Sequence, residues 1–67
     1  MVKVLLRNPR REVEVAGPVG ALALVRQLGY NREAVLVIVN GTLVTGDVTI
    51  TEGSDVEIRP VVSGGAT

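Results

Sequence analysis

Few side chains in this 67-residue sequence are suited to chemistry, because it contains no cysteine and no histidine. That absence excludes disulfides, thiol nucleophiles and the usual zinc ligand sets. The remaining candidates for proton transfer are seven acids, at turns or on the outward phase of expected strands: Glu12, Glu14, Glu33, Asp47, Glu52, Asp55 and Glu57. Isolated charges are rarely buried, so we interpret these acids as solvated surface and expect no active site in the body of the protein.

The eight glycines form no phosphate-binding loop, which would need a strand, a glycine-rich loop and a helix in that order. The stretch AGPVG precedes the expected helix but carries neither phosphate-binding fingerprint. The pair Gly64-Gly65 lies in the segment VVSGGAT, where the apolar pattern stops after Val62. A terminal glycine pair is either a frayed end or a functional arm, and the pair alone leaves both interpretations open.

The charge and the apolar runs of the sequence argue against two classes of partner. Seven basic and seven acidic residues leave no net charge, and the only aromatic residue is Tyr30. Nucleic-acid binders usually carry a basic patch, and single-strand binders add stacking aromatics. No apolar run is long enough to span a membrane, and MVKVLLRNP lacks the features of a signal peptide. We therefore expect a cytoplasmic protein with no nucleic-acid partner and no membrane partner.

Aliphatic side chains must supply the core, since hydrophobic residues make up 46% of the chain. Alternating or unbroken apolar residues predict five strands. These strands are expected at residues 2–7, 12–15, 35–39, 42–44 and 56–62. Asn40-Gly41 is a strong hairpin signal, because both residue types tolerate positive φ. Pro60 cannot donate a ladder hydrogen bond and so marks a gap in the pairing or the end of the last strand.

One helix of about ten residues is expected between the second and third strands. Gly17 and Pro18 are interpreted as its cap and first residue, with Gly20 inside it and Gly29 in a left-handed C-terminal cap. The segment that follows is a loop or a single helical turn capped by Asn31.

This order of elements predicts an α+β roll, with a mixed sheet of four to five strands and one main helix across one face. A five-stranded barrel of the oligonucleotide-binding type is the rival arrangement. On the open sheet face, we expect Leu5 and alternate residues of 35–39 to form an apolar docking patch, flanked by Arg7 and Arg59. Scattered exposed aliphatic residues are the ordinary alternative.

Residues 28–67 together resemble the small ubiquitin-like sulfur carriers of the ThiS/MoaD type. The matching features, in order, are Leu28-Gly29 at the helix end, an apolar strand ending in Asn40-Gly41, the acidic turn at Asp47, the turn from Gly53 to Asp55 before VEIRPV, and Gly64-Gly65. The opening hairpin and helix also fit, so the resemblance covers nearly the whole chain.

The resemblance implies a β-grasp domain over residues 1–62, with its first and last strands parallel at the sheet centre, and a flexible tail over residues 63–67. It implies a carrier that is not an enzyme and holds no permanent cofactor. Its partners would be a ubiquitin-activating-like adenylyltransferase that uses ATP, a sulfur donor enzyme and a sulfur-accepting synthase. In that family the terminal glycine carboxylate is adenylated and then converted to a thiocarboxylate.

Carried over to this sequence, the resemblance makes Gly65 the adenylated and sulfur-carrying residue. Gly64 would give access to a narrow channel, because glycine has no Cβ to collide with the channel walls. Ser63 would continue the arm, and Val61 and Val62 would anchor its base to the sheet.

The sequence departs from the family pattern in continuing past the second glycine to Ala66-Thr67. We therefore expect trimming between Gly65 and Ala66 by a metalloprotease of the deubiquitinase-like type. The alternatives are a chain that has lost the sulfur role and residues added by cloning.

Two other functions share these features. A ubiquitin-like modifier would be joined to lysines of other proteins through Gly65, and a plain interaction module would have an inert tail. Among carriers, relatives serve thiamine, molybdopterin, cysteine and tRNA thiouridine synthesis. The short length favours the thiamine and tRNA pathways.

Overall fold

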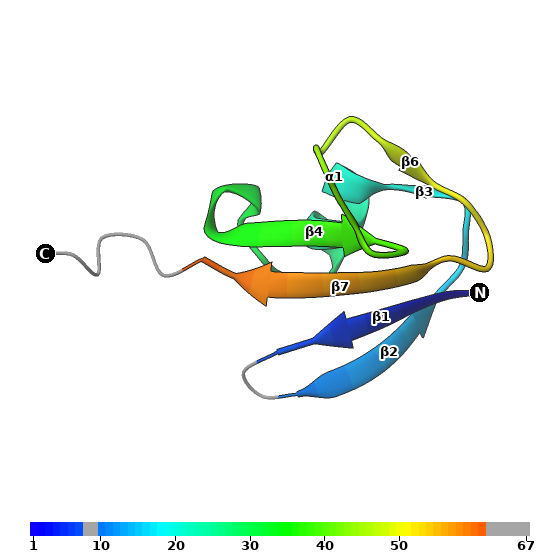
Figure 1. The fold of residues 1–67 in the computed structure, drawn as a ribbon, viewed down its shortest axis with the longest axis horizontal. Helices are drawn as coiled ribbons and strands as arrows, with labels where there is room; N and C mark the ends of the chain where they lie inside the picture. The colour runs from blue at the N-terminus through cyan, green and yellow to red at the C-terminus, as the bar shows by residue number, and fades with distance from the viewer. Residues whose placement is uncertain (8–9, 62–67) are drawn as a thin grey trace, which may run out of the picture.

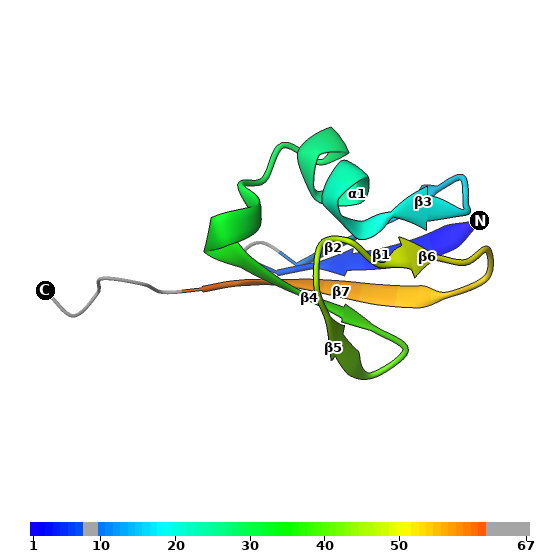
Figure 2. The same cartoon turned by 90° about the horizontal axis from the view of Figure 1, so that it is seen from above.

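The computed structural model describes residues 1–7 and 10–61. Within them, five strands form one sheet in the order β2-β1-β7-β4-β5 (Figure 1; Figure 2 also labels β5). The strands of this sheet are β1 (Val2–Leu6), β2 (Arg11–Val15), β4 (Val35–Val39), β5 (Thr42–Val44) and β7 (Asp55–Pro60). Each contains the alternating or unbroken apolar run from which it was predicted.

The first and last strands of the sheet, β1 and β7, are parallel neighbours, whereas the other pairs are antiparallel. The helix α1 (Ala21–Gln27) lies on one side of this sheet (Figure 2). The predicted α+β roll with a mixed sheet is therefore confirmed. The barrel alternative is wrong, because β2 and β5 are the two separate edges of an open sheet.

The core lies between α1 and the sheet face that the helix covers. On β1 and β7 the inward phase is fully apolar and the outward phase is mostly charged, which is typical of a sheet with one solvated face. The buried residues are aliphatic: Val2, Val4, Leu6, Val15, Ala21, Leu24, Val25, Val35, Val37, Ile50, Val56 and Ile58. The other sheet face, called the open face below, carries the outward residues.

The predicted start of the helix is wrong. The short strand β3 (Val19–Gly20) pairs antiparallel with β6 (Thr49–Ile50), so the backbone at Gly20 is extended, with φ −69° and ψ 143°. Gly20 is thus the N-cap and lies outside a helix of seven residues. No side chain caps it; instead the backbone N–H of Ala21 donates to the carbonyl oxygen of Val48 at 2.8 Å.

Gly17 and Pro18 precede β3 and do not begin the helix. The peptide bond between them is cis. A Cβ at position 17 would lie 2.8 Å from a methyl carbon of Val2 and 2.8 Å from a carboxylate oxygen of Glu52. The backbone N–H of Gly17 donates to that carboxylate at 2.9 Å. Glycine is required here by close packing of the chain, which the sequence pattern did not reveal.

The predicted end of the helix is confirmed. Gly29 has φ +86°, and the backbone N–H of Tyr30 donates to the carbonyl oxygen of Val25 at 3.0 Å, as in a Schellman cap. The following turn is a 3₁₀ helix, η1 (Arg32–Ala34). Asn31 caps it, since its side-chain oxygen accepts a 2.9 Å hydrogen bond from the backbone N–H at position 33.

The hairpin at Asn40-Gly41 is also confirmed, with φ values of 51° and 86° that fit a two-residue primed turn. Asn40 additionally joins the hairpin to the start of β7. Its backbone N–H donates to the carbonyl oxygen of Asp55 at 2.7 Å, and its side-chain oxygen accepts from the N–H of Asp55 at 2.9 Å. The hairpin therefore holds β4, β5 and β7 in register.

Candidate functional site

The C-terminal strand β7 ends at Pro60, whereas the predicted strand extended to Val62 and the predicted tail began at Ser63. Pro60 is the last residue of β7, opposite Val35 in the antiparallel register, which agrees with its predicted place at a strand end. The next residue, Val61, donates its backbone N–H to the carbonyl oxygen of Ala34 at 2.8 Å. The chain is thus attached to η1 one residue beyond β7.

The predicted tail, residues 63–67, and Val62 at its base lie outside the described part of the structure. This applies to Val62, Ser63, Gly64, Gly65, Ala66 and Thr67. The division between residues 62 and 63 and the trimming site therefore stay predictions.

Next to the tail base, the open face carries side chains in rows that follow from the strand register. The middle row crosses all five strands and consists of Glu12, Leu5, Glu57, Ile38 and Leu43. These residues share one face because each is directly opposite its neighbour in the row. The sheet therefore brings together residues from positions 5 to 57.

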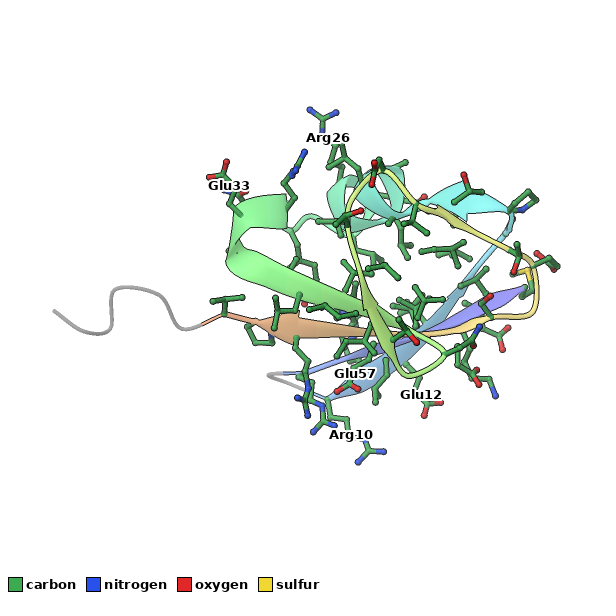
Figure 3. The ribbon with its side chains drawn as sticks, turned by 45° about the horizontal axis from the view of Figure 1, so that its top comes forward. Arg10, Glu12, Arg26, Glu33 and Glu57 are labelled. Atoms are coloured by element: carbon green, nitrogen blue, oxygen red, sulfur yellow. The ribbon has the colours of Figure 1, made fainter. Side chains whose placement is uncertain are left out.

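Two further rows flank the middle one. Towards the tail, Arg59 lies opposite Leu36, with Arg7 just beyond the end of β1. At the far end of the face, Lys3 lies between Asp55 and Glu14. The row nearest the tail thus has the positive charges of Arg59 and Arg7, with Arg10 beside them across the β1–β2 turn (Figure 3), whereas the far row has one positive and two negative charges.

The two arginines are held by one carboxylate. An oxygen of Glu57 accepts hydrogen bonds from the Nε atoms of Arg7 and Arg59, each at 2.9 Å. Arg59 and then Arg7 lower the pKa of Glu57 below its ordinary value, so the carboxylate is ionised at neutral pH. We call these three residues the Glu57 cluster.

An apolar patch adjoins the Glu57 cluster. Leu36 is 43% exposed and Leu43 is 61% exposed, and Leu5 and Ile38 are half-buried. Leu5 and Ile38 border a hollow of about 380 Å³ on this face. The sequence placed Leu5 and the alternate residues of β4 here but missed Leu43, although the two-residue hairpin already pairs position 43 with position 38.

The remaining acids occupy separate places on the surface. Glu52 contacts the N-terminal ammonium group and Gly17, and both interactions lower its pKa. The hydroxyl of Thr45 donates to Asp47 and is the main cause of its lowered pKa. In residues 1–7 and 10–61, no group of three acids, histidines or cysteines is arranged to hold a metal ion. Nor is any helix among these residues long and apolar enough to cross a membrane.

Together, the mixed sheet, the helix across one face and the parallel first and last strands define a ubiquitin-like β-grasp domain. The model of the ThiS family matches residues 4–65. The chain belongs to the ThiS family and is a ubiquitin-like sulfur carrier of the ThiS/MoaD type. Proteins of this family are small carriers and not catalysts, and membership implies interaction with an adenylyltransferase and with sulfur-transfer enzymes.

Proposed function

We propose that this protein carries sulfur as a thiocarboxylate on the carboxyl carbon of Gly65. The observation that carries the proposal is the extent of the family match, which begins at residue 4 and ends on the second glycine of the pair. The exit of β7 next to η1 supports it, because the contact of Val61 with Ala34 fixes where the terminal segment leaves the domain.

The proposed chemistry has two steps, both performed by partner enzymes. The carboxylate of Gly65 attacks the α-phosphorus of ATP, which forms an acyl-adenylate and releases pyrophosphate. A sulfur nucleophile at the oxidation level of sulfide then attacks the acyl carbon, AMP leaves, and a thiocarboxylate remains. Gly64 and Gly65 suit these steps, because neither has a Cβ that would hinder entry into an enclosed site.

The residues that follow Gly65 must be removed before the first step, since they would otherwise occupy the reactive carboxyl position. We assign this cleavage, between Gly65 and Ala66, to a metalloprotease. An adenylyltransferase that uses ATP, a sulfur donor enzyme and a sulfur-accepting synthase complete the set of partners. Thiamine synthesis and tRNA thiolation are the proposed destinations of the sulfur, and the cytoplasm is the proposed compartment.

The test is a mass measurement on a chain ending at Gly65. This chain is incubated with ATP, sulfide and the adenylyltransferase that acts on ThiS-family carriers in the same organism. We expect a product heavier by the difference between one sulfur and one oxygen atom. The control is the chain ending at Thr67, which should remain unchanged. If the chain ending at Gly65 acquires neither AMP nor sulfur, the proposal is wrong.

The same experiment in a cell extract separates carriage from conjugation. A thiocarboxylate on the free chain supports sulfur carriage, whereas adducts through lysines of other proteins would favour the modifier function. If deletion of residues 64–67 leaves pathway output intact, the chain is an interaction module with an inert tail.

A further inference from the structure

The Glu57 cluster presents two guanidinium groups whose geometry is suited to an anion. Each arginine uses its Nε atom towards Glu57, and no hydrogen bond in the described residues uses the terminal nitrogens of either side chain. The side chains of Arg7 and Arg59 are 44% and 52% exposed. Two terminal amino groups on a planar guanidinium match the two oxygens of a carboxylate. Because Glu57 already restrains both arginines, binding costs less side-chain entropy.

The distribution of charge along the open face limits the kinds of ligand that could supply this anion. The arginines lie at the end nearest the tail, while the opposite end carries Asp55 and Glu14 on either side of Lys3 and is negative on balance. A uniformly negative ligand such as a nucleic acid would meet these carboxylates, and like charges repel. A folded protein can instead place acidic side chains at one end only.

The apolar patch also favours a protein partner. Leu36 lies directly opposite Arg59, and Leu43 continues the patch to the sheet edge. No aromatic side chain lies on this face for base stacking, since the only aromatic residue, Tyr30, follows α1 and packs against the core. Apolar groups beside arginines are typical of the energetically important part of protein interfaces.

The cluster is also close to the reactive end of the chain. Arg59 is two residues before Val61, at the strand end from which the terminal segment departs. Figure 3 shows Glu57 on the side of the domain away from Arg26 and Glu33, which belong to the helical side. An anionic group bound by Arg7 and Arg59 would therefore lie beside the base of the tail.

We propose that Arg7 and Arg59 bind an acidic segment of the adenylyltransferase, and that this contact holds the carrier on that enzyme beside the base of the tail. The inference rests on the proposed sulfur-carrier function and adds the chemistry of the partner surface. The apolar patch contributes contact area, whereas the two arginines contribute charge complementarity.

The test measures adenylation of the chain ending at Gly65 by the adenylyltransferase that acts on ThiS-family carriers in the same organism. For the double variant Arg7→Glu/Arg59→Glu, we expect the half-saturating carrier concentration to rise about tenfold or more, with the maximal rate within about twofold of the original. This effect should shrink as salt increases, because salt screens exposed charges. The matched control is Arg26→Glu, which alters an exposed arginine on the helical side and should leave both parameters unchanged.

A second variant guards against loss of the fold, since Glu at position 7 or 59 repels Glu57. The neutral pair Arg7→Gln/Arg59→Gln should retain the circular dichroism spectrum and raise the half-saturating concentration by a smaller factor. In the unaltered chain, addition of the adenylyltransferase should shift the NMR signals of the Nε–H groups of Arg7 and Arg59.

The outcomes are distinguishable. If the unaltered chain is adenylated and the charge-reversed variant has the same half-saturating concentration, or Arg26→Glu has an equal effect, this inference is overturned and the sulfur-carrier function stands. If total tRNA shifts the two Nε–H signals at physiological salt and the adenylyltransferase does not, the cluster binds nucleic acid instead. If the unaltered chain is not adenylated at all, the proposed function fails and the inference falls with it.

Discussion

The backbone N–H of Val61 donates a hydrogen bond to the carbonyl oxygen of Ala34, which joins the exit of β7 to the end of η1. This bond is the last attachment of the terminal segment in the described residues. It holds the base of the tail beside the end of η1, where β4 begins.

Replacement of Val61 by proline removes the donor of this bond. We expect Val61→Pro to lower the free energy of unfolding by about 1 kcal/mol, the typical net contribution of one hydrogen bond. Val61→Ala is the control, because it keeps the N–H and should change stability by about 0.5 kcal/mol or less. Urea denaturation measures both, and equal effects of the two variants would show that the bond contributes nothing.

Ile58 tests the core between β7 and α1. It is 1% exposed, so Ile58→Ala should cost about 2–5 kcal/mol through lost burial and the cavity left behind. Because that loss approaches the whole stability of a domain this small, the milder Ile58→Val gives a measurable cost of about 0.5–1.5 kcal/mol. Leu43→Ala removes a side chain from the open face and should have little effect on thermal or urea unfolding. A large destabilisation by Leu43→Ala would contradict the observed division between core and open face.

The hairpin turn gives a prediction about backbone conformation alone. Gly41 has φ +86° and open space around the position of a Cβ, so Gly41→Ala should cost about 1–2 kcal/mol from left-handed strain. Gly46 is the matched control, because its φ lies outside the left-handed region and an added Cβ would make only ordinary contacts. Gly46→Ala should leave stability unchanged or raise it by about 0.5 kcal/mol. Comparable losses in the two variants would contradict the assigned turn.

Glu57 makes stability depend on pH. Its folded-state pKa is lowered by Arg59 and then Arg7, so its contribution is fully present above the ordinary value of 4.5 and is lost as the pH falls through the lowered value. The urea concentration at the unfolding midpoint should therefore decrease as the pH is lowered from about 6 to about 3. The variant Glu57→Gln should show a smaller decrease. Glu14→Gln is the control, because the side chain of Glu14 makes no hydrogen bond or salt bridge within the described residues, and it should leave this decrease unchanged. Equal pH profiles for Glu57→Gln and the unaltered chain would refute the coupling.

Much of the fold was predictable, because local signals in the sequence agree with the final structure. The alternation in β1 and β7, the glycine that ends α1 and the Asn40-Gly41 turn depend on interactions between neighbouring residues. Such signals are visible in the sequence without any knowledge of the tertiary contacts. The parallel pairing of β1 with β7 came only from the resemblance to a known family.

The errors arose where distant contacts override local preference. Gly17 and Pro18 look like a helix start, but the pairing of β3 with β6 keeps the chain extended until Gly20. The close approach of Gly17 to Val2 and Glu52 spans most of the sequence and leaves no local signature. Arg7 and Arg59 were expected beside the apolar patch, but Glu57 was missed as their shared partner, since Arg7 is fifty residues away from this carboxylate.

The parallel arrangement of β1 and β7 has a mechanical consequence. The first residue of β1 and the last residue of β7 lie at opposite ends of the domain (Figure 1). A force that pulls these two ends apart acts along both strands and loads the evenly spaced bonds between them together, rather than opening them one by one. The domain that carries the tail therefore resists a pulling force on its C-terminus. An enzyme that pulls on this end must shear the bonds between β1 and β7 before it can unfold the chain.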